Sequence, residues 1–581
     1  MTIKRWVILL MLFTLVVAAC GGGDDDVADT TLAGIDTTEA ATDTTEAMVD
    51  TTAGTGTTAG TGTTGAPAEG MVAAANCDYG GKISSIEATG ESEVVFTLCS
   101  PDPAFLAKMA FVPFAIQPAE HLDAMGGSPL DTPIGTGPFM LDNWARGSEI
   151  VFTANENYWG DVPAFSTLVF RWAEESTSRI LELQSGTADM ATNLAASDYA
   201  TVEGDPNLVL LPDQNPNIFY MGFNNTYPPF DDVRVRQAIA MGIDRQRVID
   251  TFYPTGSEVP THFTPCSIPN ACEGDPWYDF DPEAAQALLA EAGFPDGFET
   301  TIFLRDVFRV YLPEPQVVAQ ELQTQLEENL GITATIEVQE SGAFLEANAA
   351  GQHDGIHLLG WGADYPHVTN FLDFHFGGEN IQFGDAHPEI TEPLGEGAAT
   401  IDEAAAAPIY AEANNAIREL VPMVPIAHGA AADAAVATLE GVNVPPFGAP
   451  QFAKMTPASD TLVFVQNAEP ISLYCADETD GESLSACEQV LEALYGYDLD
   501  GSVIPKLAEE CVANEDGTVW TCTLRQGVTF HDGSAFDSAD VIASWAAGID
   551  AANPNHVGNT GVFEYFSYLW GGLINAPPAA E

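Results

Sequence analysis

The pattern of apolar and polar residues from position 281 to 338 predicts two helices and a strand in succession. The segment DPE at 281–283 supplies an N-cap, a first-turn proline and an acidic residue before an apolar-rich run, and Gly293 follows that run. Apolar residues at every fourth position of 318–330, followed by Gly331, predict a second helix. Apolar residues at alternate positions of 332–338 then predict a strand with one buried face.

Other segments predict the same mixture of helices and strands. A helix is expected over 235–243, and Asp244 is placed as the N-cap of the next helix. Two β-rich runs within 511–524 flank the turn sequence NEDG and predict a hairpin. The segment DGIHLLGWG at 354–362 predicts a further strand. The chain therefore belongs to the α/β class.

The length and net charge of the chain exclude some classes of function. With 581 residues the chain exceeds what one hydrophobic core usually supports, so we expect two or three lobes. A formal charge of -68 would repel phosphate backbones, which argues against nucleic acid as a partner. The sequence contains no GxSxG, HExxH or Walker motif, so we expect a protein that is not an enzyme and needs no cofactor.

The first residues carry an export signal. Lys4 and Arg5 precede an apolar run that ends in LVVAAC at Cys20, which is similar to a bacterial lipobox. Residues 1–20 are therefore interpreted as a lipoprotein signal peptide, with Cys20 as the lipidated residue. Residues 21–76 are rich in Gly, Thr, Asp and Ala and are predicted to form a disordered tether.

The remaining eight cysteines fit a disulfide framework in an exported protein. Eight cysteines allow 105 pairings, so the sequence alone leaves the connectivity open. We expect bonds within the close couples Cys77 with Cys99, Cys266 with Cys272, Cys475 with Cys487, and Cys511 with Cys522. No metal site is expected. No CxxC motif occurs, and two histidines four apart in a strand, His353 and His357, would have rings about 13 Å apart.

Several motifs together resemble family 5 solute-binding proteins of ABC importers, the dipeptide and oligopeptide-binding type. They are PIGTGPF (133–139), NENYWG (155–160), LQSGTADM (183–190), FDDVRVRQAIAMGIDR (230–245), DPEAAQALLAEAGFPDGF (281–298), GWGADYP (360–366), and VIPKLAEE with DGTVWTCTLRQGVTFHDGSAFDSADV (503–541). The resemblance implies a periplasmic-binding-protein-like α/β fold, with two main lobes and an extra subdomain around a ligand cleft.

The order of these motifs departs from the family. The segment resembling the family's opening, 461–575, follows the segment resembling its later part, 77–455, across a short polar join at 456–460. The chain therefore resembles a circular permutation of the family's fold; two incomplete tandem copies are the alternative. One lobe is expected from 134–228, 428–455 and 461–494, and the other from 229–427. The subdomain is expected from 77–133 and 495–575.

The resemblance also suggests ligand-binding residues. Asp364 matches the carboxylate that receives a peptide's ammonium, and it lies beside Trp361 and Tyr365. Arg309 resembles the arginine that receives the peptide's carboxylate. After Pro366 the family often has Asp-Pro where this chain has His367 and Val368, which leaves the adjoining loop undefined.

The implied function is binding of a small solute, most simply a di- or oligopeptide, and its delivery to ABC permease subunits. The protein would act as a monomer outside the cytoplasm, held to the cell membrane by its lipid. Two alternatives stay open: another solute on the same scaffold, such as an oligosaccharide or a metal chelate, and a sensor or chaperone lipoprotein without a transport role.

Overall fold

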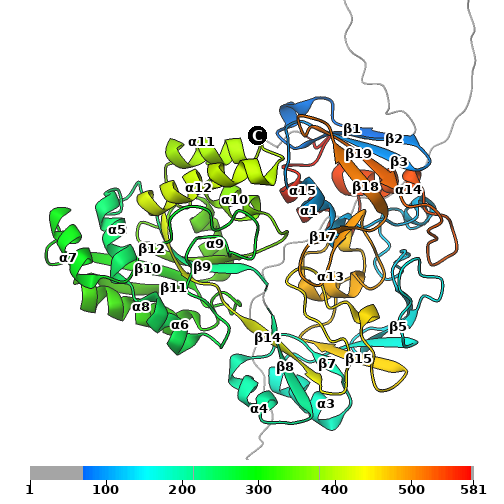
Figure 1. The fold of residues 1–581 in the computed structure, drawn as a ribbon, viewed down its shortest axis with the longest axis horizontal. Helices are drawn as coiled ribbons and strands as arrows, with labels where there is room; N and C mark the ends of the chain where they lie inside the picture. Colours follow the sequence, from blue (N-terminus) through cyan, green and yellow to red (C-terminus); the bar gives the residue numbers. More distant parts are fainter. Residues whose placement is uncertain (1–69, 214, 379, 578–581) are drawn as a thin grey trace, which may run out of the picture. The chain divides into compact units, whose positions relative to one another are not determined.

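The computed structural model describes residues 70–213, 215–378 and 380–577, and three β-sheets organise them (Figure 1). Cys20, the predicted signal peptide 1–20 and the predicted tether up to residue 69 lie outside the described residues. All described residues belong to one compact unit. None of their helices has the length and apolar character needed to cross a membrane.

The strands follow a fixed order within each sheet. The first sheet has the order β1 (Met71–Ala73), β2 (Ile83–Gly90), β3 (Glu93–Leu98), β19 (Val519–Leu524) and β18 (Ala508–Ala513). The second has the order β4 (Phe139–Ala145), β5 (Glu149–Ala154), β6 (Thr167–Trp172), β15 (Thr461–Gln466), β7 (Met190–Ala191), β14 (Ala431–Val436) and β8 (Leu208–Asp213). The third has the order β11 (Thr333–Gln339), β10 (Glu299–Arg305), β12 (Ile356–Gly362), β9 (Asn217–Phe223) and β13 (Met423–Ala427). A small hairpin pairs β16 (Tyr495–Tyr497) with β17 (Val503–Pro505).

Helices are distributed among the three sheets, and together with the sheets they form the expected α/β architecture. They are α1 (Phe105–Met109), α2 (Ala119–Ala124), α3 (Ser176–Ser185), α4 (Tyr199–Glu203), α5 (Val233–Gly242), α6 (Arg245–Phe252), α7 (Pro282–Glu291), α8 (Pro315–Leu330), α9 (Ser341–Ala349), α10 (Leu372–Phe376), α11 (Pro388–Gly397), α12 (Glu403–Leu420), α13 (Gly481–Cys487), α14 (Ser538–Ile549) and α15 (Glu564–Leu569).

The seven-stranded sheet, with its helices, forms what we call the first lobe. Strand β15 lies inside this sheet, parallel to β6 on one side and to β7 on the other. Its residues alternate between the two faces: Leu462 and Phe464 join one apolar core, and Val465 joins the other. The part of the chain after residue 460 is therefore built into the centre of a sheet whose other strands precede it.

The sheet of β1–β3, β18 and β19 forms the subdomain, and it also joins distant parts of the chain. Strand β19 pairs with β3 in antiparallel register, from Val519 opposite Thr97 to Thr523 opposite Glu93. The predicted tether extends too far, because β1 at residues 71–73 pairs with β2 and buries Val72. Burial of this apolar side chain, together with the β1–β2 pairing, contributes to the ordering of this end of the segment.

The second lobe surrounds the sheet of β9–β13 (Figure 1). Its predicted boundary at 228/229 is wrong, because β9 pairs with β12 and β13 rather than with the first lobe. The chain passes between the two lobe sheets after β8 and again before β14. The two passages contact each other, since the Asn217 amide donates to the Gly429 carbonyl at 2.7 Å and accepts from the Gly429 amide at 2.8 Å.

Most local predictions are confirmed. Asp281 caps α7 by accepting a hydrogen bond from Ala284 N, and Gly331 ends α8 in the left-handed conformation. Asp244 caps α6, and the predicted hairpin forms from β18 and β19. The alternation predicted for 332–338 holds only in part, because Val338 at the sheet edge is 46% exposed.

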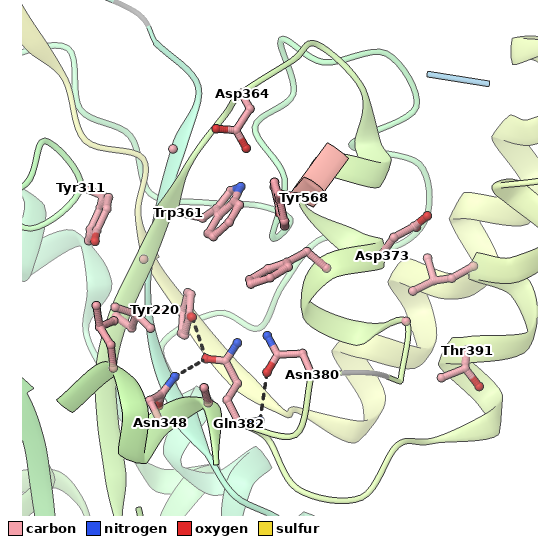
Figure 2. Close-up of a pocket in the computed structure, with 18 of the residues that line it drawn as sticks. Tyr220, Tyr311, Asn348, Trp361, Asp364, Asp373, Asn380, Gln382, Thr391 and Tyr568 are labelled. Carbon is pink, nitrogen blue, oxygen red and sulfur yellow. Dashed lines mark hydrogen bonds between the residues drawn. The ribbon is translucent and has the colours of Figure 1, made fainter. Parts of the chain in front are cut away.

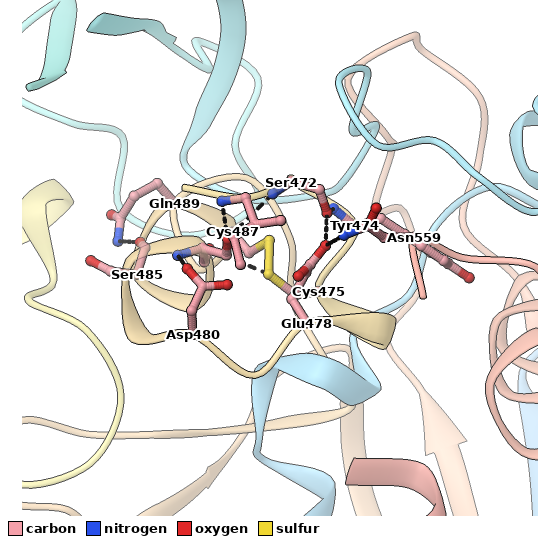
Figure 3. Close-up of a disulfide and its surroundings, with 11 residues drawn as sticks. Ser472, Tyr474, Cys475, Glu478, Asp480, Ser485, Cys487, Gln489 and Asn559 are labelled. Atoms are coloured by element: carbon pink, nitrogen blue, oxygen red, sulfur yellow. Dashed lines mark hydrogen bonds between the residues drawn. A yellow bond between two sulfur atoms is a disulfide. The ribbon is translucent and has the colours of Figure 1, made fainter. Parts of the chain in front are cut away.

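The four predicted disulfides are present: Cys77–Cys99, Cys266–Cys272, Cys475–Cys487 and Cys511–Cys522. Figure 3 shows the third of these, which joins the turn after Tyr474 to helix α13. Two hydrogen bonds hold the adjoining Glu478, one from the Ser472 hydroxyl and one from the Asn559 amide. This disulfide therefore stabilises the connection from β15 to the subdomain.

Candidate functional site

A cavity of about 1010 Å³ lies between the second lobe and the subdomain. Its second-lobe wall comes from strands β9, β10 and β12 and from helices α9, α10 and α11, and Lys82 and Tyr568 close it from the subdomain. Arg305 ends β10, and Asp364 lies two residues beyond the end of its parallel neighbour β12. Both charged residues therefore lie toward the carboxyl ends of parallel strands, where ligands of open α/β sheets bind.

Asp364 is held by a single amide side chain. Asn370 donates from Nδ2 to Asp364 Oδ2 at 3.0 Å. The Asn370 oxygen accepts from the Asp364 backbone amide at 3.1 Å and from the Trp361 indole at 3.2 Å. Burial raises the pKa of Asp364 from 3.8 to about 6, against the lowering effect of the Asn370 bond. The site thus holds a carboxylate that a cationic ligand group would stabilise.

Arg305 supplies the opposite charge. Its guanidinium donates to the Ser341 hydroxyl at 3.0 Å and lies 3.5 Å from the Tyr311 hydroxyl. Both partners are neutral, and among the residues that the structure describes no carboxylate lies within ion-pair distance of Arg305. The fork of a guanidinium matches a carboxylate, so Arg305 can accept one from a ligand.

A second carboxyl group, that of Asp373 on α10, also lines the cavity. Its Oδ1 is buried and has no hydrogen-bond partner among the described residues. Burial raises the pKa of Asp373 to about 7, while Lys108 and Lys82 of the subdomain act in the opposite direction. Lys108 itself pairs with Asp102 at 2.7 Å. Asp373 therefore faces subdomain cations without pairing with them.

The remaining wall is polar at one end and aromatic at the other (Figure 2). The side-chain oxygen of Gln382 accepts from the Tyr220 hydroxyl at 2.9 Å and from the Asn348 amide at 3.0 Å. Near Asp364, the Trp361 ring stacks on Phe374 with centroids 4.3 Å apart. The cavity therefore offers apolar surface beside the carboxylate and hydrogen-bonding groups farther from it.

The structure brings together two of the four predicted ligand residues. Asp364 and Trp361 line the cavity. Tyr365 is 5% exposed and packs behind the wall, where its hydroxyl bonds to Thr369. Arg309 does not line the cavity, because its backbone pairs with Leu312 in a tight turn that leaves the side chain exposed. Arg305, four residues earlier in the chain, lines the cavity instead.

His353 and His357 are both buried, and their predicted separation is wrong. The ring centroids of His353 and His357 lie 6.1 Å apart, because His353 precedes β12 and does not extend along it.

The sequence analysis also missed Arg305, Asp373 and Lys82 at the cavity. Arg305 could have been considered from the sequence, since it is the last residue of the strand sequence TTIFLR.

Comparison with known proteins connects this geometry to a family. The profile of the bacterial extracellular solute-binding proteins, family 5, matches residues 37–383 and 502–563. Heme-binding protein A of Haemophilus influenzae is 29% identical over 63% of this chain and 68% of its own, and di/tripeptide-binding protein 1 of Pseudomonas aeruginosa is 30% identical over 64% and 71%.

Solved structures give the same result. HbpA2 from Haemophilus parasuis is similar with a TM-score of 0.59 and 27% identity, over 65% of this chain and 76% of that one. A dipeptide-binding protein from Pseudoalteromonas, in complex with Met-Leu, has a TM-score of 0.52 and 27% identity over the same shares. Proteins of this family are substrate-binding proteins and not enzymes. The two-lobed fold, the charged cavity and the profile match together show that the chain belongs to the bacterial extracellular solute-binding proteins, family 5.

Proposed function

We propose that this protein binds peptides with free termini outside the cytoplasm and delivers them to an ABC importer. The observation that carries the proposal is the pair of opposite charges in one cavity, Asp364 and Arg305, each held only by neutral side chains. A short peptide is a zwitterion, so its ammonium could pair with Asp364 and its carboxylate with Arg305. Removing it from water requires charged partners for both ends.

Relatives support a peptide as the ligand. Two relatives are named for peptide ligands. They are di/tripeptide-binding protein 1 of Pseudomonas aeruginosa and the dipeptide-binding protein of Pseudoalteromonas, whose structure contains Met-Leu. Heme-binding protein A differs in its named ligand, so heme is the alternative that the experiment must include. The aromatic wall beside Asp364 would pack against the apolar part of a peptide's first residues.

The anchoring and the chain order belong to the same proposal. Cys20 would carry the lipid, and the segment up to residue 69 would connect it to the folded unit. A Cys20→Ala variant should then be found in the soluble fraction of cells, whereas the unaltered protein stays with the membrane. The permuted order is supported by β15, which lies at the centre of its sheet beside β6, a strand almost 300 residues earlier in the chain.

Calorimetry with dipeptides tests the ligand assignment. Leu-Leu should bind, and both N-acetylated and C-amidated Leu-Leu should bind at least tenfold more weakly, since losing one partner of a buried charge pair typically costs about 2 to 5 kcal/mol. Arg305→Gln should weaken Leu-Leu by a similar factor.

Arg309→Gln is the matched control, because it removes the same charge four residues away and outside the cavity. Equal affinity for free and blocked dipeptides, or tighter binding of heme than of any peptide, would contradict the proposal.

A further inference from the structure

A second cavity, of about 360 Å³, adjoins the first at Asp364, which lines both. Its walls come from strands β8, β14 and β15 and helix α13 of the first lobe, with Phe111 and Tyr565 of the subdomain. No lysine or arginine is part of this lining. Five carboxylic acids are: Asp213, Asp364, Asp433, Glu482 and Glu488.

Asp433 is the most buried of these acids, with 3% of its surface exposed. Its Oδ1 accepts from the Thr192 hydroxyl at 2.8 Å and from the Asn193 amide at 2.9 Å. Its other oxygen accepts no hydrogen bond among the described residues. Arg179, the basic residue whose charge acts on Asp433, donates to four backbone carbonyls instead. A buried carboxylate thus faces the cavity without a cation to pair with.

The other acids add to the unbalanced charge. Burial, and to a smaller extent the neighbouring Asp213, raise the pKa of Asp433 to about 7, against the lowering effects of Thr192, Asn193 and Arg179. Burial also raises the pKa of Glu488 to about 7, although the Ala449 amide donates to it at 2.6 Å. Carboxylates that share a small cavity resist ionisation until a cation neutralises them. The cavity is therefore built to favour a positively charged occupant.

The arrangement suits an organic cation better than a metal ion. Within residues 70–213, 215–378 and 380–577, the one group of three potential ligands that converge is His262, Cys266 and Cys272, and its two sulfurs form a disulfide. The acids of the second cavity do not converge in this way. Ammonium and guanidinium groups carry several donors and can bond to separated oxygens.

We propose that the second cavity receives the basic side chain of the ligand's first residue, which makes the protein selective for peptides beginning with lysine or arginine. The inference rests on the proposed function, because Asp364 is taken to hold the ligand's α-ammonium. The first side chain leaves the same carbon as that ammonium. It therefore starts at the junction of the two cavities and can extend toward Asp433 and Glu482.

Calorimetry with two dipeptides tests this selectivity. Norleucyl-leucine has the same unbranched stem as Lys-Leu and lacks the charge, so Lys-Leu should bind at least tenfold more tightly. Asp433→Asn and Glu482→Gln should each reduce that preference severalfold, and binding of norleucyl-leucine by the variants would show that they fold. Glu203→Gln removes an exposed acid of the first lobe and should leave the preference intact.

The other possible results separate a failure of this inference from a failure of the peptide assignment. Equal affinities of Lys-Leu and norleucyl-leucine would overturn this inference while the peptide assignment stands. Binding of neither dipeptide would overturn both. Calcium binding in the absence of peptide, lost in Asp433→Asn, would replace the side-chain site with a metal site.

Discussion

Replacing Asp364 by asparagine should make the ligand-free protein more stable while it weakens peptide binding. In the folded protein the pKa of Asp364 is raised from 3.8 to about 6 by burial. The folded state therefore favours the protonated carboxyl more than the unfolded state does, and Asp364 destabilises the protein increasingly as the pH rises from about 4 to about 6. Asparagine has no charge to desolvate and can still accept the bond from Asn370.

The expected gain follows from these two pKa values. By linkage it is about 1 to 2 kcal/mol at pH 5 and about 3 kcal/mol at pH 7. Denaturant unfolding of the ligand-free protein and of Asp364→Asn at both pH values measures it. Asp142→Asn, at an exposed position of β4, is the control and should change stability by less than about 0.5 kcal/mol. Equal stability of Asp364→Asn and the unaltered protein at pH 7 would refute the reasoning.

Three further predictions use other parts of the structure. Because the α-ammonium needs an ionised Asp364 and the pKa is about 6, dipeptide affinity should fall about tenfold from pH 7 to pH 5; a flat calorimetric profile would exclude Asp364 as the partner. Residues 70–455 and 456–577 produced separately should each fail to give a cooperative melt, since β15 and β19 complete sheets begun by the other part, and two independent cooperative melts would contradict this. Replacing Cys475 and Cys487 by serine together should lower the free energy of unfolding by about 3 kcal/mol, as expected for a bridge closing a 12-residue loop; an unchanged denaturation midpoint would show that the bridge contributes little.

Local features of the fold were predictable because they depend on neighbouring residues. Asp281, Asp244 and Gly331 act at helix ends through backbone groups within a few positions, so their roles follow from sequence. The disulfides were also predictable, since each joins cysteines that are close along the chain.

The pairing of β15 could not be derived from its own residues. The sequence TLVFVQ predicts a strand, but its position between β6 and β7 depends on the packing of segments about 300 residues apart. The same limit applies to β9, which lies next to the first lobe in sequence and pairs in the second. Non-local pairing depends on the whole topology, so the lobe boundary was misplaced.

The candidate site was predictable from the sequence only in part. Arg305 and Arg309 are four residues apart, and the choice between them depends on where β10 stops and how the following turn is directed. Asp433 is harder still to predict, because it lies on a strand of the first lobe and lines a cavity that also includes Asp364 of the second lobe.

The most direct test of peptide binding is to identify the ligands that the protein retains. Protein purified without denaturation from cells grown on a peptide-rich medium would be unfolded in acid, and the released molecules identified by mass spectrometry. We predict short peptides with free amino and carboxyl termini, enriched in lysine or arginine at the first position, and their loss from the Asp364→Asn protein. Recovery of heme or an uncharged oligosaccharide, retained equally by Asp364→Asn, would contradict the account.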